Sequence, residues 1–180
     1  MGYGEENLME LSVGDIVMHP QYGPARVTGL EDHEWVEGFK RYCVLEIPGQ
    51  NLKLRLPLLH VEALGLRPIM SEDKAAQVMR TLGGAAEPLA EDARERQVVL
   101  QDRIKTCAPL EVASVIRDLN GRQRESHLTR RDSEILERAR HLLTAEIASA
   151  TGSERGPVDQ AITEVLATPP AEPSDGEPAL

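Results

Sequence analysis

The apolar residues of this chain change their period once, close to Pro57, and that change limits the possible folds more than any other feature. Before it, residues 52–56 alternate leucine with lysine and arginine, as in a strand with one apolar and one basic face. After it, apolar residues recur at helical spacing as far as Leu166. Strands followed by helices predict the α+β class, with a boundary near residues 67–71.

Glycine and proline divide the first part of the chain into short segments typical of a small β domain. Along one segment, Tyr42, Val44 and Glu46 should lie on one face of the strand and the intervening residues on the other. The expected strands, within a β domain of residues 11–68, cover 16–18, 25–30, 41–47 and 52–56. Several short strands in so few residues suit a small curled sheet or an SH3-like barrel.

The helical pattern predicts a compact bundle over residues 69–167. Ser71 is a suitable N-cap, and Thr129 with Asp132 resembles a capping box. The expected helices cover about 58–64, 72–82, 88–105, 109–119, 130–147 and 158–166. Residues 1–10 and the acidic, proline-rich residues 168–180 are expected to be disordered.

Composition excludes several classes of function. The net charge of −10 argues against non-specific coating of nucleic acid, which requires a cationic surface. No apolar run approaches the length of a membrane span, so we expect a cytoplasmic protein. Cys43 and Cys107 have no metal-ligand or redox spacing, and reduced thiols are expected. The five histidines are scattered and no catalytic motif is present, which predicts a non-enzyme without metal or cofactor.

A series of short motifs, in order and with few gaps from about Leu11 to Leu166, resembles the CarD/CdnL family of bacterial transcription regulators. None of the motifs is specific by itself, but their order and spacing are. They are Val13-Gly14-Asp15, His19-Pro20, Gly23 with Val27, Tyr42-x-Val44-Leu45, Arg55-x-Pro57, Gly65-Leu66-Arg67, Val115-Ile116-Arg117-Asp118-Leu119, Leu128-Thr129 and Ala139-Arg140.

The resemblance implies an SH3/Tudor-like N-terminal domain, shared with the transcription-repair coupling factor, that binds the RNA polymerase β subunit. It also implies a helical domain at the upstream edge of the promoter bubble. Members of the family stabilise the open promoter at many genes. We expect a monomer that regulates transcription through the polymerase.

Four residues are candidates for polymerase binding. Arg55 matches the family's basic docking position, and the alternative is a solvated edge charge that discourages aggregation. Lys53 shares its face of the strand. Trp35, the only tryptophan, is expected where the second strand meets a turn, as either an interface anchor or a cover for one end of the barrel. His33 stands where the family often has a basic residue, which could weaken docking or select another partner.

Four arginines are candidates for contact with promoter DNA: Arg94, Arg96, Arg122 and Arg124. The alternative is that they form surface ion pairs, for example between Asp92 and Arg96. Ala93 occupies the position of the family's minor-groove tryptophan, and an alanine cannot fill an unstacked base step. Two functions therefore stay open, a regulator acting at the promoter fork and a protein–protein adaptor that does not stabilise open promoters.

Overall fold

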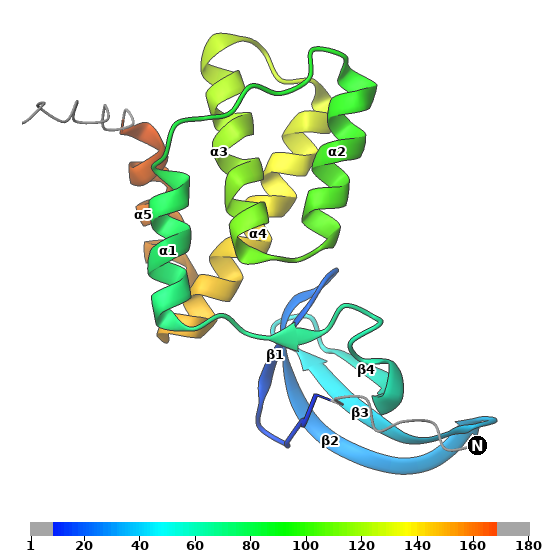
Figure 1. Ribbon diagram of the computed structural model, residues 1–180. Helices are drawn as coiled ribbons and strands as arrows, with labels where there is room; N and C mark the ends of the chain where they lie inside the picture. Colours follow the sequence, from blue (N-terminus) through cyan, green and yellow to red (C-terminus); the bar gives the residue numbers. More distant parts are fainter. Residues whose placement is uncertain (1–8, 169–180) are drawn as a thin grey trace, which may run out of the picture.

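A computed structural model describes residues 9–168 of the 180-residue chain. In this range a five-stranded antiparallel sheet is followed by five α-helices, which confirms the α+β class (Figure 1). The SH3/Tudor-like description and the domain limits stay predictions. The expected disorder concerns residues 1–10 and 168–180, of which 1–8 and 169–180 lie outside the described residues.

The sheet has the strand order β4-β3-β2-β1-β5, so β4 lies at one edge and pairs only with β3. The strands are β1 (Ile16–His19), β2 (Gly23–Val36), β3 (Phe39–Ile47), β4 (Leu52–Pro57) and β5 (Arg67–Pro68). β2 is longer than the sequence predicted, because its acid-rich second half pairs with β3 although it lacks an apolar face. His33 and Trp35 therefore lie on a strand and not at a turn.

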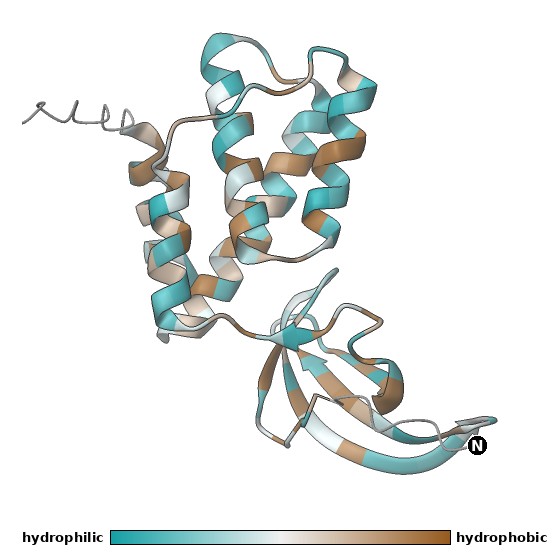
Figure 2. Ribbon diagram, in the orientation of Figure 1, coloured by the Kyte–Doolittle hydropathy of each residue, from teal (hydrophilic) through white to brown (hydrophobic). Residues whose placement is uncertain are grey.

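The predicted alternation of faces in the sheet is confirmed. Leu54 lies opposite Leu45, and Arg55 lies opposite Val44. The inner face forms an apolar core that includes Val27, Cys43 and Leu45, and the leucines of β4 pack against this core. The alternating brown and teal segments along these strands can be followed in Figure 2.

The helices are α1 (Glu72–Leu82), α2 (Ala93–Lys105), α3 (Pro109–Glu125), α4 (Arg130–Thr151) and α5 (Arg155–Ala167). Three predicted limits are wrong. Residues 58–64 form only a 3-10 turn, η1 (Leu58–His60). α2 begins at Ala93, not near Pro88, because the Asp92 side chain accepts hydrogen bonds from the first backbone amides of the helix. α3 continues past Gly121 to Glu125.

Gly121 has a packing role in place of the predicted stop. A Cβ atom at this position would lie 2.3 Å from the Cβ of Ala86, in the segment between α1 and α2. The glycine therefore permits that segment to lie directly on α3. The capping box of Thr129 and Asp132 at the start of α4 is confirmed, as is the N-cap Ser71 of α1.

A partly buried ion pair joins the sheet to the helices. Arg67 of β5 makes a bidentate contact with Glu146 of α4, at 2.5 and 2.7 Å, and donates to the backbone carbonyl of Cys107. Glu146 also accepts a hydrogen bond from the backbone amide of Met70. Met18 of β1 belongs to the helical core. The helices thus hold the β1–β5 side of the sheet and leave β4 at the opposite edge.

Candidate functional site

Aromatic and charged side chains gather on the outer face of the sheet next to the β4 edge. We call Glu31, His33, Trp35, Tyr42 and Arg55 the outer-face cluster. The Trp35 ring stacks on His33, with centroids 5.0 Å apart, and meets Tyr42 edge-on at 4.8 Å. The guanidinium carbon of Arg55 lies 5.4 Å from the Trp35 ring centroid, a cation–π distance. Three of the four residues predicted to bind polymerase are therefore in one cluster.

Strand register brings these residues together. Glu31 of β2 lies opposite Tyr42, and Arg55 of β4 lies opposite Val44, so the two charged residues flank the central strand β3 diagonally. Arg55 Nε donates to Glu31 Oε2 at 3.1 Å across β3. The long second half of β2 then places Trp35 over Tyr42. Three adjacent antiparallel strands thus build one surface from residues far apart in the sequence.

The cluster positions Arg55 without burying it. The Arg55 side chain is 49% exposed, and its pair with Glu31 is worth at most about 1 kcal/mol in such surroundings. Within the described residues, only Nε of this guanidinium donates a hydrogen bond. The two terminal nitrogens are therefore available for a bidentate contact with a carboxylate of another molecule. Trp35, 48% exposed, offers a large rigid apolar surface beside them.

Lys53, the fourth predicted residue, lies on the same outer face opposite Glu46 and is exposed. Lys53 and Arg55 together form a basic stripe along the outer face of β4. Because β4 pairs with β3 only, its other edge has backbone groups that a strand of a partner could meet. The edge and the stripe belong to the same six residues, Leu52–Pro57.

The arginines considered for DNA contact do not form one exposed face. Arg96 is 2% exposed, so it cannot reach a phosphate, and the prediction that it contacts DNA is wrong. Its Nη2 lies 2.8 Å from Asp132 Oδ2, and its Nη1 donates to the carbonyls of Ala90 and Glu91. The surface pair expected between Asp92 and Arg96 is also wrong, because Asp92 caps α2 and Arg96 turns inward.

The other three arginines are separated. Arg94 is exposed near the start of α2. Arg122 Nη2 lies 3.3 Å from a carboxylate oxygen of Glu91, and Arg124 donates to the backbone carbonyl of Leu166 at the end of α5. Two of the three thus have partners inside the protein. Ala93 is the first residue of α2 and is only partly exposed.

Sequence reasoning missed Glu31 and Tyr42 as parts of the outer-face cluster. Tyr42 had been placed on the correct face of its strand, but the strand that covers it was predicted to end at Leu30. The alternation of Glu31, His33 and Trp35 was a usable signal for a longer strand. The pair between Glu31 and Arg55 spans three strands, so it requires knowledge of the register.

Residues 9–168 do not show the patterns of metal sites, cysteine pairs or membrane-spanning helices. No group of three or more histidine, cysteine or carboxylate side chains in that range could hold a metal ion. The two cysteines are free and buried, and burial raises the pKa of Cys43 to about 11. Over the same range, no helix has both the length and the apolar composition to cross a membrane.

Comparison with known proteins links the two halves of the chain to transcription. Residues 11–70 match the CarD-like/TRCF RID domain, and residues 77–163 match the CarD C-terminal domain. A protein of Bacillus subtilis (strain 168) named "Putative transcription factor YdeB" is 23% identical over 140 residues, which cover 78% of this chain and 92% of that protein. The first match covers the whole sheet, and the second runs from within α1 to within α5.

Proposed function

This chain belongs to the CarD/CdnL family of transcription regulators, and we propose that it binds the RNA polymerase β subunit through the outer-face cluster and the β4 edge. The family assignment supports a polymerase as the kind of partner. The exposed pairing of Arg55 with Trp35 is the single observation that carries the choice of surface. Tryptophan and arginine are the residues most enriched where interface energy is concentrated.

Two contacts would act together in this complex. A strand of the β subunit would pair with β4 and extend the sheet, so that backbone hydrogen bonds supply affinity. An acidic group on the partner would meet the two terminal nitrogens of Arg55, while Glu31 keeps its contact with Nε. His33 would support the Trp35 ring, on which it stacks. Lys53 would add longer-range attraction that salt weakens.

The test is binding of the purified β subunit to immobilised full-length protein. Arg55→Glu should weaken binding by about tenfold or more, because a carboxylate at this position would repel the acidic group of the partner that Arg55 attracts. Arg41→Glu is the matched control: it reverses a charge on the neighbouring strand, but position 41 faces the opposite side from position 42. Unchanged binding of Arg55→Glu, or equal loss in the control, would reject the proposed surface.

A second function, an adaptor that does not stabilise open promoters, is favoured by the helical half. Arg96 is buried, Arg122 and Arg124 have partners within the protein, and Ala93 lacks the volume of a wedge between bases. A protein with these features could bind polymerase and still leave the promoter fork unaltered. We therefore propose promoter contact only as a weak component, with Arg94 as the exposed candidate.

Open-complex lifetime at a ribosomal RNA promoter separates the two functions. The adaptor function predicts no change in lifetime when the protein is added, and a gain when Ala93→Trp supplies the missing ring. A clear increase with the unaltered protein would contradict the adaptor function. Capture of β in the same preparation confirms that the protein is active, so that the absence of an effect can be interpreted.

A further inference from the structure

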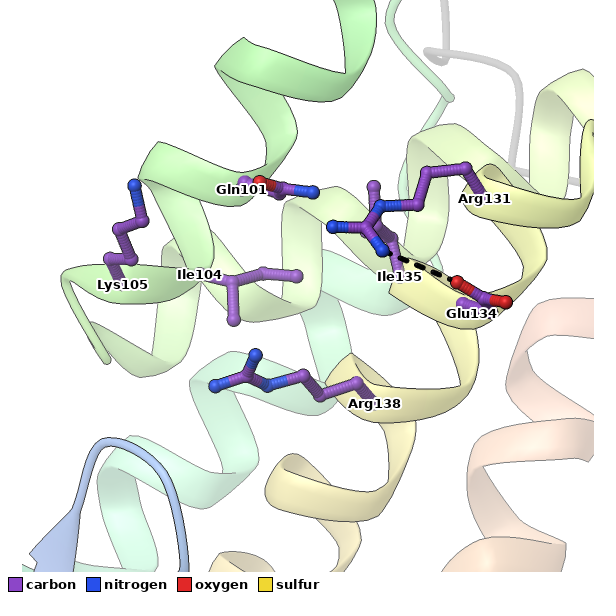
Figure 3. Close-up of a pocket in the computed structure, with 7 residues that line it drawn as sticks. All are labelled: Gln101, Ile104, Lys105, Arg131, Glu134, Ile135 and Arg138. Carbon is purple, nitrogen blue, oxygen red and sulfur yellow. Dashed lines mark hydrogen bonds and ion pairs between the residues drawn. The ribbon is translucent and has the colours of Figure 1, made fainter.

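A cationic groove lies between α2 and α4, on the helical half of the molecule. It encloses about 160 Å³ and is lined by Gln101, Lys105, Arg131 and Arg138, with Ile104 and Ile135 on its floor. In Figure 3 the Arg131 guanidinium points from α4 toward Gln101 on α2, and the Arg138 guanidinium extends beneath Ile104. Neither this groove nor its residues take part in the polymerase surface proposed above.

The groove carries more positive than negative charge, although the whole chain has a net charge of −10. Three cations line it, against one carboxylate, Glu134. Arg131 lies 3.4 Å from Glu134, and Lys105 is paired at 2.9 Å with Asp102. Among the described residues, no carboxylate lies within 4.0 Å of the Arg138 guanidinium, and Arg138 is exposed. The groove therefore has at least one cation ready to receive an acid.

Apolar surface accompanies these charges. Ile104 and Ile135 line the groove and belong to the buried core, so each exposes only a small part of its side chain there. Val98 is 61% exposed one helical turn before Gln101 and two before Lys105, so these three residues share one side of α2. Side chains of this kind match a ligand that has both apolar and acidic groups. The sugar–phosphate backbone of DNA has little apolar surface and is bound by cations spaced along a track.

We propose that the groove between α2 and α4 binds an acidic, amphipathic segment of a protein partner. Carboxylates of the segment would contact Arg138, Arg131 and Lys105, and an apolar side chain would rest on Ile104 and Ile135. An amphipathic helix in a groove is a common way to recognise such a segment. The site is separate from β4, so one molecule could join this partner to the protein bound at the sheet.

The test uses the full chain and a fluorescent synthetic peptide of about 15 residues, long enough to form a helix, with leucines along one face and glutamates elsewhere. Anisotropy measures its affinity. The double variant Arg131→Ala/Arg138→Ala should weaken binding by about tenfold. Arg130→Ala is the matched control: Arg130 is more exposed, also contacts Glu134, and does not line the groove. The control should bind as tightly as the unaltered protein.

The apolar contribution is tested with a second peptide in which serine replaces leucine, and it should bind several-fold more weakly. Equal binding of the double variant and the unaltered protein, or no saturable binding at low salt, would overturn the proposal. So would tighter binding of a short DNA duplex that the double variant loses, which would assign the groove to nucleic acid. A rise in peptide affinity after removal of residues 169–180 would assign it to the chain's own acidic end.

Discussion

Arg96 is held inside the protein by partners on two segments. Its guanidinium contacts Asp132 at the start of α4 and the carbonyls of Ala90 and Glu91 before α2. Asp132 is itself fully buried and receives further hydrogen bonds from Thr129 and Gln97. A buried pair with every group satisfied is tolerated, but the loss of one partner leaves an uncompensated charge. Arg96 is thus a structural residue that joins α2 to α4.

Arg96→Ala should lower the free energy of unfolding by about 3–5 kcal/mol, because Asp132 would remain charged and buried without its partner. Urea denaturation followed by circular dichroism measures the change. Arg94→Ala, two residues earlier on the exposed side, should change stability by less than about 0.5 kcal/mol. Similar stability of the two variants would show that Arg96 does not join α2 to α4.

Asp132 also predicts a dependence of stability on pH. Burial alone would raise the pKa of its carboxyl, but hydrogen bonds from Arg96 and Thr129 outweigh burial and lower it. A carboxyl with a lowered folded pKa stabilises the protein above its unfolded pKa of about 3.9, and that contribution is lost as pH falls through the folded value. Urea midpoints should therefore fall below about pH 4. Asp132→Asn should show a smaller fall over that range, and an identical fall would contradict the assignment.

Among the helices, α3 contains a residue, Gly121, whose identity depends on the segment that packs against it. Gly121 lies inside α3, where glycine costs about 1 kcal/mol relative to alanine. A larger residue does not fit at this position, because Ala86, in the segment before α2, packs directly against Gly121. Close approach of the two backbones therefore determines the residue at position 121.

Gly121→Ala should destabilise the protein by about 1–3 kcal/mol, since the added methyl overlaps Ala86 and overpacking outweighs the gain in helix propensity. The double variant Gly121→Ala/Ala86→Gly removes the overlap and should recover most of the lost stability. Thermal unfolding of the three variants measures the coupling between the two sites. Additive effects of the two changes would mean that the sites do not touch.

The sequence predicted elements best where an element has its own periodic pattern. The alternation in β4, the cap of α1 and the capping box of α4 are local features, and the structure confirms them. The second half of β2 has no apolar alternation, and only pairing with β3 makes it a strand. The burial of Arg96 depends on Asp132, 36 residues away, so no local pattern could reveal it. Three residues of the outer-face cluster were identified, whereas Glu31 and Tyr42 required the strand register.

At the scale of the whole molecule, the pair between Arg67 and Glu146 couples the sheet to the helices. Glu146 is almost completely buried and also binds the backbone amide of Met70 in the connecting segment. Arg67 reaches the carbonyl of Cys107 before α3. One carboxylate thereby fixes the strand β5, the connection to α1 and the bundle in one arrangement.

Glu146→Ala should lower the free energy of unfolding by about 1–3 kcal/mol, because the Met70 amide and the partly buried Arg67 lose their acceptor, and it should reduce the cooperativity between the two halves. Trp35 is the only tryptophan and lies in the sheet, so its fluorescence reports unfolding of that half, while circular dichroism at helical wavelengths reports the bundle. The two transitions should coincide in the unaltered protein and separate in the variant. Coincident transitions in both proteins would mean that other contacts supply the coupling.

Hydrogen exchange of the full-length protein with and without RNA polymerase locates the surface that the polymerase covers, and it is therefore the decisive test of binding through β4. We expect polymerase to slow the exchange of amides in Leu52–Pro57, whose free edge would be paired, and in the second half of β2 around Trp35. Unchanged exchange in β4, with protection confined to the helices, would contradict binding through β4.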